Sequence, residues 1–313
     1  AGPGWYAGPM QGDRHWPAVQ DYLLNEKHWS EDAVESIDRS SNDVLAVIGN
    51  PDDATMDVRG LVLGYVQSGK TANMTGVIAK AVDRGYNFVI LLAGLTNALR
   101  RQTQGRMEDD LIDRNPYNWE RLTTRDENGD FTRPANDRFL ALTADDARFA
   151  VIKKNVSPLK ALISTLRETP EAVLNQFRFL VIDDECDQAS VNGAGTEYDT
   201  TRINGQIRDL LALMPRVTYV GYTATPFANV FINPFQPGTS NPEDLYPRSF
   251  IKALDMPDGY FGTERLFGRD PVSEDDPGAE GLDMIRTVKP EEVDFLRPRR
   301  ARDRDDFEPK VTP

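Results

Sequence analysis

The residues best suited to chemistry form a glycine-containing segment, residues 64–71, which reads Gly-Tyr-Val-Gln-Ser-Gly-Lys-Thr. It satisfies the pattern G-x-x-x-x-G-K-[ST] between an apolar run and an amphipathic stretch, which is the context of a phosphate-binding loop. Glycines let backbone N–H groups converge on phosphate oxygens, the lysine reaches the β- and γ-phosphates, and the threonine hydroxyl can ligate Mg²⁺. The alternative is a chance glycine turn, which the flanking pattern disfavours. We therefore expect ATP and Mg²⁺ as cofactors, bound by Gly64, Gln67, Ser68, Gly69, Lys70 and Thr71.

A second group of reactive residues follows the apolar run 179–182, where the chain reads Asp183-Asp184-Glu185-Cys186-Asp187. Ligands of open α/β sheets bind at the carboxyl ends of the strands. Phosphoryl transfer needs one acid to hold Mg²⁺ and another to orient or deprotonate the attacking water. Asp184 suits the metal and Glu185 suits the water, so Lys70 and Glu185 are the predicted catalytic residues. The alternative is an ordinary solvated acidic loop. The phosphate loop upstream in the sequence disfavours this alternative.

From residue 60 onward, short apolar runs alternate with amphipathic stretches, which is typical of βαβ units on a parallel sheet. Strands are predicted over 61–63, 88–93, 150–152, 179–182 and 217–221, and helices over 158–167 and 203–214. A further helix follows the glycine loop and ends at Gly85. These positions place both reactive groups at the ends of strands.

Three segments differ in composition and spacing. Residues 1–58 carry apolar residues at helical spacing and are predicted to form a helical N-terminal extension, with Ser30 and either Ser40 or Ser41 as helix N-caps. Residues 59–235 are predicted to form the ATPase lobe, with a polar insertion at about 113–147. Residues 236–313 are predicted to be an irregular segment and linker, because they are charged and proline-spaced without apolar periodicity.

Composition narrows the class of function. The chain has 313 residues, a formal net charge of -14, one cysteine and two histidines. A single cysteine excludes an internal disulfide and a multi-thiolate metal site. The acidic balance argues against a surface that is positive throughout for nonspecific nucleic-acid binding. No apolar run approaches the ~20 residues of a membrane helix and no secretory signal is present, so we expect a cytoplasmic protein without a membrane partner.

The sequence resembles the superfamily 2 helicases and translocases. Asp184-Glu185-Cys186-Asp187 is similar to their D-E-x-D motif, and Thr223-Ala224-Thr225 is similar to their S/T-A-T motif in the expected order. The residues around the motifs resemble one branch more closely. This branch is the bacterial helicase-like proteins of the Z-one domain family, described as candidate endonucleases and often linked to restriction or defence systems. The resemblance covers roughly residues 10–235.

The resemblance implies a three-layer α/β fold, a RecA-like P-loop NTPase domain with a mostly parallel sheet, which would be the first motor lobe of a DNA helicase or translocase. It implies that Asp187, Thr223 and Thr225 couple hydrolysis to movement between lobes. Such motors need a second lobe that shares the DNA groove and supplies an arginine finger. No convincing second lobe follows Thr225 in the sequence, so this chain alone is expected to hydrolyse ATP weakly.

The resemblance also places Thr96, Asn97 and Arg100 where such motors touch the nucleic-acid backbone. Lys153 and Lys154 form a second candidate contact of the same kind. A solvated helix face is the alternative for Arg100 and its neighbours Arg101 and Arg106. Two other classes of function stay open. One is a nucleotide-gated interaction module that does not unwind, with protein partners in a defence system. The other is an endonuclease subunit whose nuclease site lies outside this chain.

Overall fold

The chain divides into two compact units, residues 1–258 and residues 259–313. The computed structural model describes residues 4–64, 69–134, 146–186, 197–224, 245 and 247–255, together with 266, 268, 278 and 280–282. Within the second unit, the backbone N–H of Leu282 donates to the carbonyl of Leu266 at 3.1 Å. All the elements below belong to the first unit.

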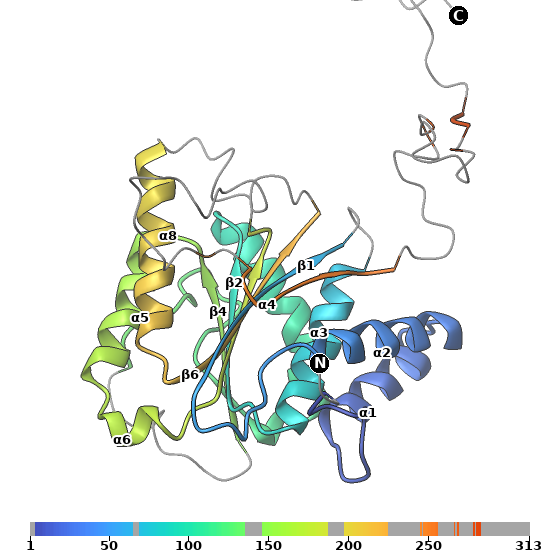
Figure 1. Cartoon of the computed structure of the whole chain (residues 1–313), viewed down its shortest axis with the longest axis horizontal. Coiled ribbons are helices and arrows are strands. Elements are labelled where there is room, and N and C mark those ends of the chain that lie inside the picture. The colour runs from blue at the N-terminus through green and yellow to red at the C-terminus, as the bar shows by residue number, and fades with distance from the viewer. Residues whose placement is uncertain are drawn as a thin grey trace, which may run out of the picture. The chain divides into compact units, whose positions relative to one another are not determined.

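The first unit is built on a seven-stranded sheet in which every described pair of neighbouring strands is parallel (Figure 1). The strand order is β3-β4-β2-β5-β6-β1-β7. This arrangement confirms the predicted α/β fold with a parallel sheet. The strands are β1 (Met56–Leu63), β2 (Phe88–Ala93), β3 (Trp119–Arg121), β4 (Ala147–Lys153), β5 (Phe179–Asp184), β6 (Arg216–Thr223) and β7 (Phe250–Ala253).

Helices cover both faces of this sheet and make three layers (Figure 1). One face is covered by α1 (His15–Asp21), α2 (Glu31–Leu45), α3 (Lys70–Asp83) and α4 (Asn97–Asp110). The other is covered by α5 (Val156–Glu168), α6 (Glu171–Leu174) and α8 (Glu197–Ala212). Shorter turns complete the unit, namely the π-helix Tyr22–Glu26 and the 3₁₀ turns Ile112–Arg114 and Pro116–Asn118.

The central strand β2 shows how the sequence builds both layers of core. All six of its residues are buried, as expected for a parallel strand covered on both faces. Successive side chains point to opposite faces, so Val89 and Leu91 join the core beneath α3, whereas Ile90 and Leu92 join the core beneath α5 and α8. A continuous apolar run, rather than an alternating one, is therefore the correct signal for this strand.

Helix α2 is longer than the sequence suggested. Ser30 is its N-cap, as predicted, and its Oγ accepts from the N–H of Ala33 at 3.2 Å. The N-cap prediction for Ser40 or Ser41 is wrong, because both residues lie inside the helix. The Oγ of Ser41 donates back to the carbonyl of Ile37 at 2.6 Å, which satisfies the hydroxyl without ending the helix.

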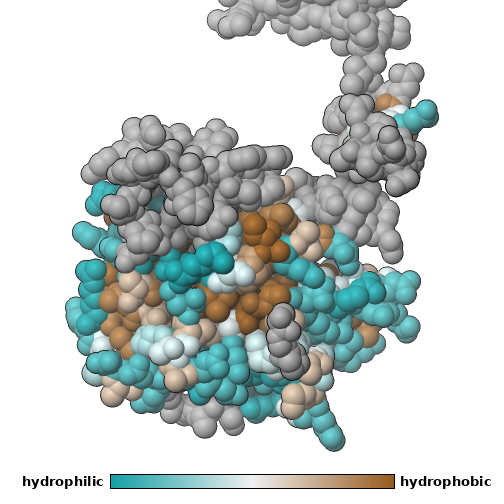
Figure 2. Space-filling view, in the orientation of Figure 1, coloured by the Kyte–Doolittle hydropathy of each residue, from teal (hydrophilic) through white to brown (hydrophobic). Residues whose placement is uncertain are grey.

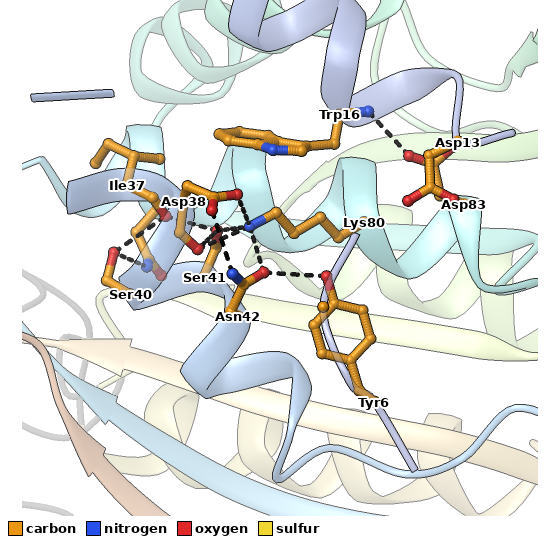
Figure 3. Close-up of polar contacts among 12 residues, drawn as sticks. Tyr6, Asp13, Trp16, Ile37, Asp38, Ser40, Ser41, Asn42, Lys80 and Asp83 are labelled. Atoms are coloured by element: carbon orange, nitrogen blue, oxygen red, sulfur yellow. Dashed lines mark hydrogen bonds and ion pairs between the residues drawn. The ribbon is translucent and has the colours of Figure 1, made fainter. Parts of the chain in front are cut away.

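A buried lysine joins α2 to α3 (Figure 3). The Nζ of Lys80 contacts four oxygens of α2, which are the Asp38 carbonyl (2.8 Å), the Asp38 carboxylate (2.8 Å), Ser41 Oγ (2.8 Å) and Asn42 Oδ1 (2.7 Å). It also lies 4.3 Å from the centroid of the Trp16 ring, which brings α1 into the same cluster. Burial lowers the pKa of Lys80 to about 8, although the Asp38 carboxylate opposes this shift.

The same end of α3 also anchors α1. Asp83 is the last residue of α3, and its carboxylate accepts from the backbone N–H groups of Arg14, His15 and Trp16, each at 2.9 Å. The side chain of Arg14, the residue at the N-cap position of α1, makes no capping hydrogen bond. A carboxylate from another helix therefore satisfies the first N–H groups of α1 and complements its dipole.

Replacing Asp83 with alanine is expected to lower the free energy of unfolding by about 2 kcal/mol, since it removes three charge-assisted hydrogen bonds at a helix start. Urea denaturation followed by circular dichroism measures this loss. Asp209→Ala on α8, where the carboxylate is exposed, is the matched control and is expected to unfold like the wild type. Equal midpoints for the two variants would contradict the capping role.

The surface of the first unit is largely hydrophilic on the face that Figure 2 shows, with hydrophobic side chains gathered over the sheet edge near β1 and β7. Among the residues of β7, Ile251 is 48% exposed. The edge is short and carries Lys252, which pairs with Asp43 at 2.8 Å, a charged edge of the kind that discourages strand addition. Among the described helices, none has the length and apolarity required to cross a bilayer.

Candidate nucleotide site

The start of α3 has the geometry of an anion site. Gly69 takes a left-handed conformation (φ 84°) that suits glycine, and it precedes the helix without any side-chain cap. The first-turn N–H groups, beginning at Lys70, therefore have no side-chain cap from this residue, as is usual where a helix start binds an anion. The loop residues between Gly64 and Gly69, which include the predicted ligands Gln67 and Ser68, lie outside the described residues.

Gly64 lies where the stem of Lys70 passes. A Cβ at Gly64 would lie 2.6 Å from the Lys70 Cγ and 2.9 Å from its Cδ, so the first glycine of the motif makes room for the lysine. The Gly64 N–H donates to the carbonyl of Thr223 at 3.0 Å, which ties the end of β1 to the end of β6. Lys70 and Thr71 are both half-buried. The loop lysine is thus held against the sheet edge rather than free in solvent.

The acidic turn after β5 lies at the same edge of the sheet. β6 separates β5 from β1, and the Cys186 N–H donates to the Tyr222 carbonyl at 3.1 Å. Gly221 allows this approach, because a Cβ there would meet the Cys186 Sγ at 2.8 Å. The turn that carries Asp184 and Glu185 is therefore attached to the strand next to the glycine loop.

The alternation of the strand divides the acids between the two faces of the sheet. Asp183 is buried, and its Oδ2 accepts from the Tyr219 hydroxyl at 2.8 Å in the layer beneath α8. Asp184 lies on the other face, where burial and the Glu185 carboxylate raise its pKa and the charge of Lys70 lowers it. Asp184 therefore lies near enough to Lys70 for the lysine charge to act on its carboxyl, and the assignment of both residues to one nucleotide site stays a prediction.

The oxygens at this edge fit Mg²⁺ bound together with phosphate. Thr71 supplies a hydroxyl and Asp184 a carboxylate, which are hard ligands of the kind Mg²⁺ prefers. In the part of the chain that the structure describes, no three His, Cys, Asp or Glu side chains are grouped as a metal cage. Mg²⁺ usually retains waters and takes phosphate oxygens beside one or two protein ligands, so two ligands suffice.

Glu185 has an uncommon backbone conformation. Its φ is 53°, in the left-handed region that residues with a Cβ rarely adopt. Its side chain is half-buried beside Asp184. Such strain persists only where the surrounding contacts fix it, and it is found often at functional sites. The predicted water-orienting residue is thus the strained residue of this turn.

The S/T-A-T segment begins at the end of β6. Thr223 is buried there, whereas the other two predicted coupling residues, Asp187 and Thr225, lie outside the described residues. Sequence reasoning missed the residues that connect this strand to α3. The Tyr222 hydroxyl donates to Asn73 Oδ1 at 2.9 Å, and the Asn73 amide donates to Ser40 Oγ at 3.0 Å. In the sequence, the one sign of these hydrogen bonds is the polar residue Asn73 within an otherwise apolar helix face.

Two of the predicted nucleic-acid contacts are wrong, because their side chains are buried. Arg100 is 0% exposed and donates to the carbonyls of Thr124 (2.9 Å) and Asp126 (2.9 Å), so it orders the turn after β3. Lys154 is 1% exposed, and its Nζ lies 3.0 Å from the Asp183 carboxylate. Neither side chain can reach a phosphate in this arrangement.

The other three candidates lie together at the surface. Thr96 is the N-cap of α4, with its Oγ1 accepting from the Leu99 N–H at 3.3 Å, and Asn97 is exposed beside it. The Lys153 Nζ donates to Asn97 Oδ1 at 2.6 Å. Arg101 and Arg106 are also exposed along α4, so the helix presents both the candidate contacts and additional positive charge. This face stays a predicted nucleic-acid contact.

Comparisons with known proteins show distant similarity only. No family model matches the chain, and no curated protein matches it. Among solved structures, it is similar to a DEAD-box helicase bound to single-stranded RNA and UDP-BeF (16% identity, TM-score 0.38). It is also similar to a deletion variant of that helicase bound to single-stranded RNA and AMP-PNP (13% identity, TM-score 0.41). Each match covers 79% of this chain and 47% of the other, so this chain spans about half the length of the helicase chains.

Proposed function

We propose that this protein binds Mg²⁺–ATP and hydrolyses it as the first motor lobe of a helicase-like or translocase-like enzyme. The observation that supports this most is the meeting of two motifs at one sheet edge. The α3 start with Lys70 and the β5 turn with Asp184 and Glu185 are far apart in sequence, yet β6 lies between β1 and β5 and is hydrogen-bonded to the ends of both.

The chemistry follows from these positions. The N–H groups at the start of α3 and the Lys70 ammonium would hold the phosphates, while Thr71 and Asp184 would hold Mg²⁺, whose charge stabilises the transferred phosphoryl group. Glu185 would orient the attacking water. Little covalent chemistry falls to the protein, because positioning and electrostatics supply most of the barrier reduction in phosphoryl transfer.

We propose that the motor acts on nucleic acid, and the resemblance to the Z-one branch, with its link to restriction systems, favours DNA. Thr96, Asn97 and Lys153 form a polar face at the carboxyl ends of β2 and β4, along the same sheet edge as the acids. Contacts of this kind position a backbone without reading its sequence. We propose that a second lobe completes the groove, and that the protein acts in the cytoplasm within a restriction or defence system of the Z-one type.

Steady-state ATP hydrolysis by the full-length protein, with and without single- and double-stranded DNA, tests this proposal. We expect hydrolysis to rise with DNA, and Lys70→Ala to remove the rise, because the lysine charge on the phosphates is lost. Lys160→Ala, an exposed change on α5, is the matched control and is expected to behave like the wild type.

Three other results would lead elsewhere. ATP binding with hydrolysis that ignores DNA would favour a nucleotide-gated interaction module. DNA cleavage that needs a metal and survives Lys70→Ala would favour an endonuclease subunit. Absence of both ATP binding and hydrolysis in the full-length protein would reject the nucleotide site itself.

A further inference from the structure

We propose that Lys154 is a positioning residue that fixes the turn bearing the predicted catalytic acids, an inference that rests on the proposed ATPase function. Lys154 follows β4, and its side chain is 0% exposed. Its Nζ contacts three oxygens of the acid turn, which are the Asp183 carboxylate (3.0 Å), the Asp184 carbonyl (2.7 Å) and the Glu185 carbonyl (2.8 Å). The contacts with the two carbonyls are hydrogen bonds, and the contact with the Asp183 carboxylate is an ion pair.

The lysine reaches the turn from two strands away. In the sheet, β2 lies between β4 and β5. The Lys154 N–H donates to the carbonyl of Ala93 at 3.1 Å, which anchors its backbone at the end of β2. The side chain then extends to the end of β5. One residue thus joins the carboxyl ends of three neighbouring strands, an arrangement stiffer than any single loop contact would give.

The position is costly, which indicates that it serves a purpose other than packing. A buried ammonium loses its hydration, and the charge of Asp183 compensates because that carboxylate is itself buried. Asp183 also accepts from Tyr219, so its second oxygen is satisfied on the other side. Apolar residues of similar volume often replace a buried ion pair without loss of stability. The charged pair has one further effect, which is to orient two backbone carbonyls.

Those carbonyls belong to the residues proposed to act on Mg²⁺ and water. Glu185 is held at a φ of 53°, and its carbonyl accepts from Lys154. On the other side of the same turn, the Cys186 N–H donates to Tyr222. Without the hydrogen bond from Lys154, fewer contacts would hold Glu185 at its positive φ. Its backbone would relax toward the negative φ values that most residues adopt. Its carboxylate would then leave the place where the attacking water must be oriented.

Lys154→Met in the full-length protein tests the kinetic part of this inference. We expect kcat for ATP to fall about 10²-fold, the cost of a roughly 1 Å misplacement in an active site. The Kd of a fluorescent ATP analogue is expected to stay close to the wild-type value, because the phosphate loop keeps its own contacts. Lys160→Met, the same change at an exposed site on α5, is expected to leave both values unchanged.

A second variant separates positioning from folding. Lys154→Met leaves the Asp183 carboxylate buried without its cation, so the single variant is expected to lose stability. Lys154→Met combined with Asp183→Asn removes that charge while leaving an oxygen for the Tyr219 hydroxyl. We expect this double variant to recover the thermal midpoint and to keep the low kcat. Recovery of kcat together with stability would overturn the inference and leave Lys154 a structural residue.

Hydrogen exchange gives a readout that does not depend on hydrolysis. In the double variant without nucleotide, the peptide containing the Cys186 amide is expected to exchange at least about tenfold faster than in the wild type, because the turn opens locally. Unchanged exchange would overturn the positioning role even if ATPase activity were lost. If the wild type hydrolyses no ATP, the proposed function fails, and the exchange rate still decides whether Lys154 fixes the turn.

Discussion

Glu185→Gln is expected to lower the ATP turnover of the full-length protein about 10³-fold while leaving nucleotide binding intact, within the range found for a lost general base. Glutamine keeps the size of the side chain and an oxygen that accepts hydrogen bonds. Its neutral amide cannot act as a base toward the attacking water. The predicted phosphate ligands Gly69, Lys70 and Thr71 lie at the start of another element, α3, so they keep their geometry. The change therefore isolates the water-orienting step from binding.

Single-turnover kinetics with a parallel binding measurement check this expectation. Glu171→Gln, an exposed glutamate at the start of α6, is the matched control for removal of one negative charge. Because Glu185 also raises the pKa of Asp184, its neutralisation should ease ionisation of the proposed metal ligand. Binding of Mg²⁺–ATP to Glu185→Gln should then be as tight as in the wild type or tighter. Turnover at the wild-type rate would exclude Glu185 from the role proposed for it.

Lys80→Met is expected to lower the free energy of unfolding by about 3 kcal/mol at pH 7, the lower end of the range for breaking a buried ion pair. Methionine keeps most of the apolar stem but removes every donor. Ser41 Oγ and Asn42 Oδ1 then lose their contacts with Nζ, and Asp38 loses its cation. Urea denaturation measures the difference, with Lys160→Met as the exposed control. If Lys80→Met lost no more stability than the control, the Lys80 contacts would not stabilise the packing of α2 on α3.

The same pair of proteins gives a pH dependence with a definite sign. The pKa of Lys80 is about 8 in the folded state and 10.5 as the ordinary value for the unfolded chain. Between these values the unfolded chain binds the proton more strongly, so rising pH favours the folded state. The stability advantage of the wild type over Lys80→Met should therefore grow from pH 8 to pH 10, by up to about 1.4 kcal/mol per pH unit. A constant or shrinking advantage would show that the folded-state pKa is not depressed.

The main elements of the fold were readable from the sequence because each carries a strong local signal. The apolar run 88–93 coincides with β2, and the amphipathic stretch 158–167 lies within α5. The edge strand β7 was not predicted. Its four residues are too few for a clear apolar run or alternation, and each of them is half-buried or exposed. The strand β3, inside the segment predicted as a polar insertion, was missed for the same reason.

The site was predictable only where chemistry is encoded in neighbouring residues. The glycine loop and the acids stand in short motifs, so their types and spacing identify them. Arg100 and Lys154 show the limit of that reasoning. Both look like surface cations in sequence, and both are buried because carbonyls from other segments accept their hydrogen bonds. Every residue has a backbone carbonyl. The sequence therefore does not indicate which carbonyls will accept hydrogen bonds from a buried lysine or arginine.

The position of β1 in the sheet has a consequence for the order of events during synthesis. Its two neighbours are β6 and β7, and Met56 lies beside Arg216 in the register. On a ribosome, β1 and the glycine loop emerge long before either partner strand exists. A nascent chain ending at the acid turn already contains every predicted nucleotide ligand. Its strand β1, which precedes the glycine loop, still has no strand to pair with. The chain can therefore bind nucleotide only late in synthesis, when β6 pairs with both β1 and β5. Strand pairs that are distant in sequence form slowly, and parallel sheets depend on such pairs.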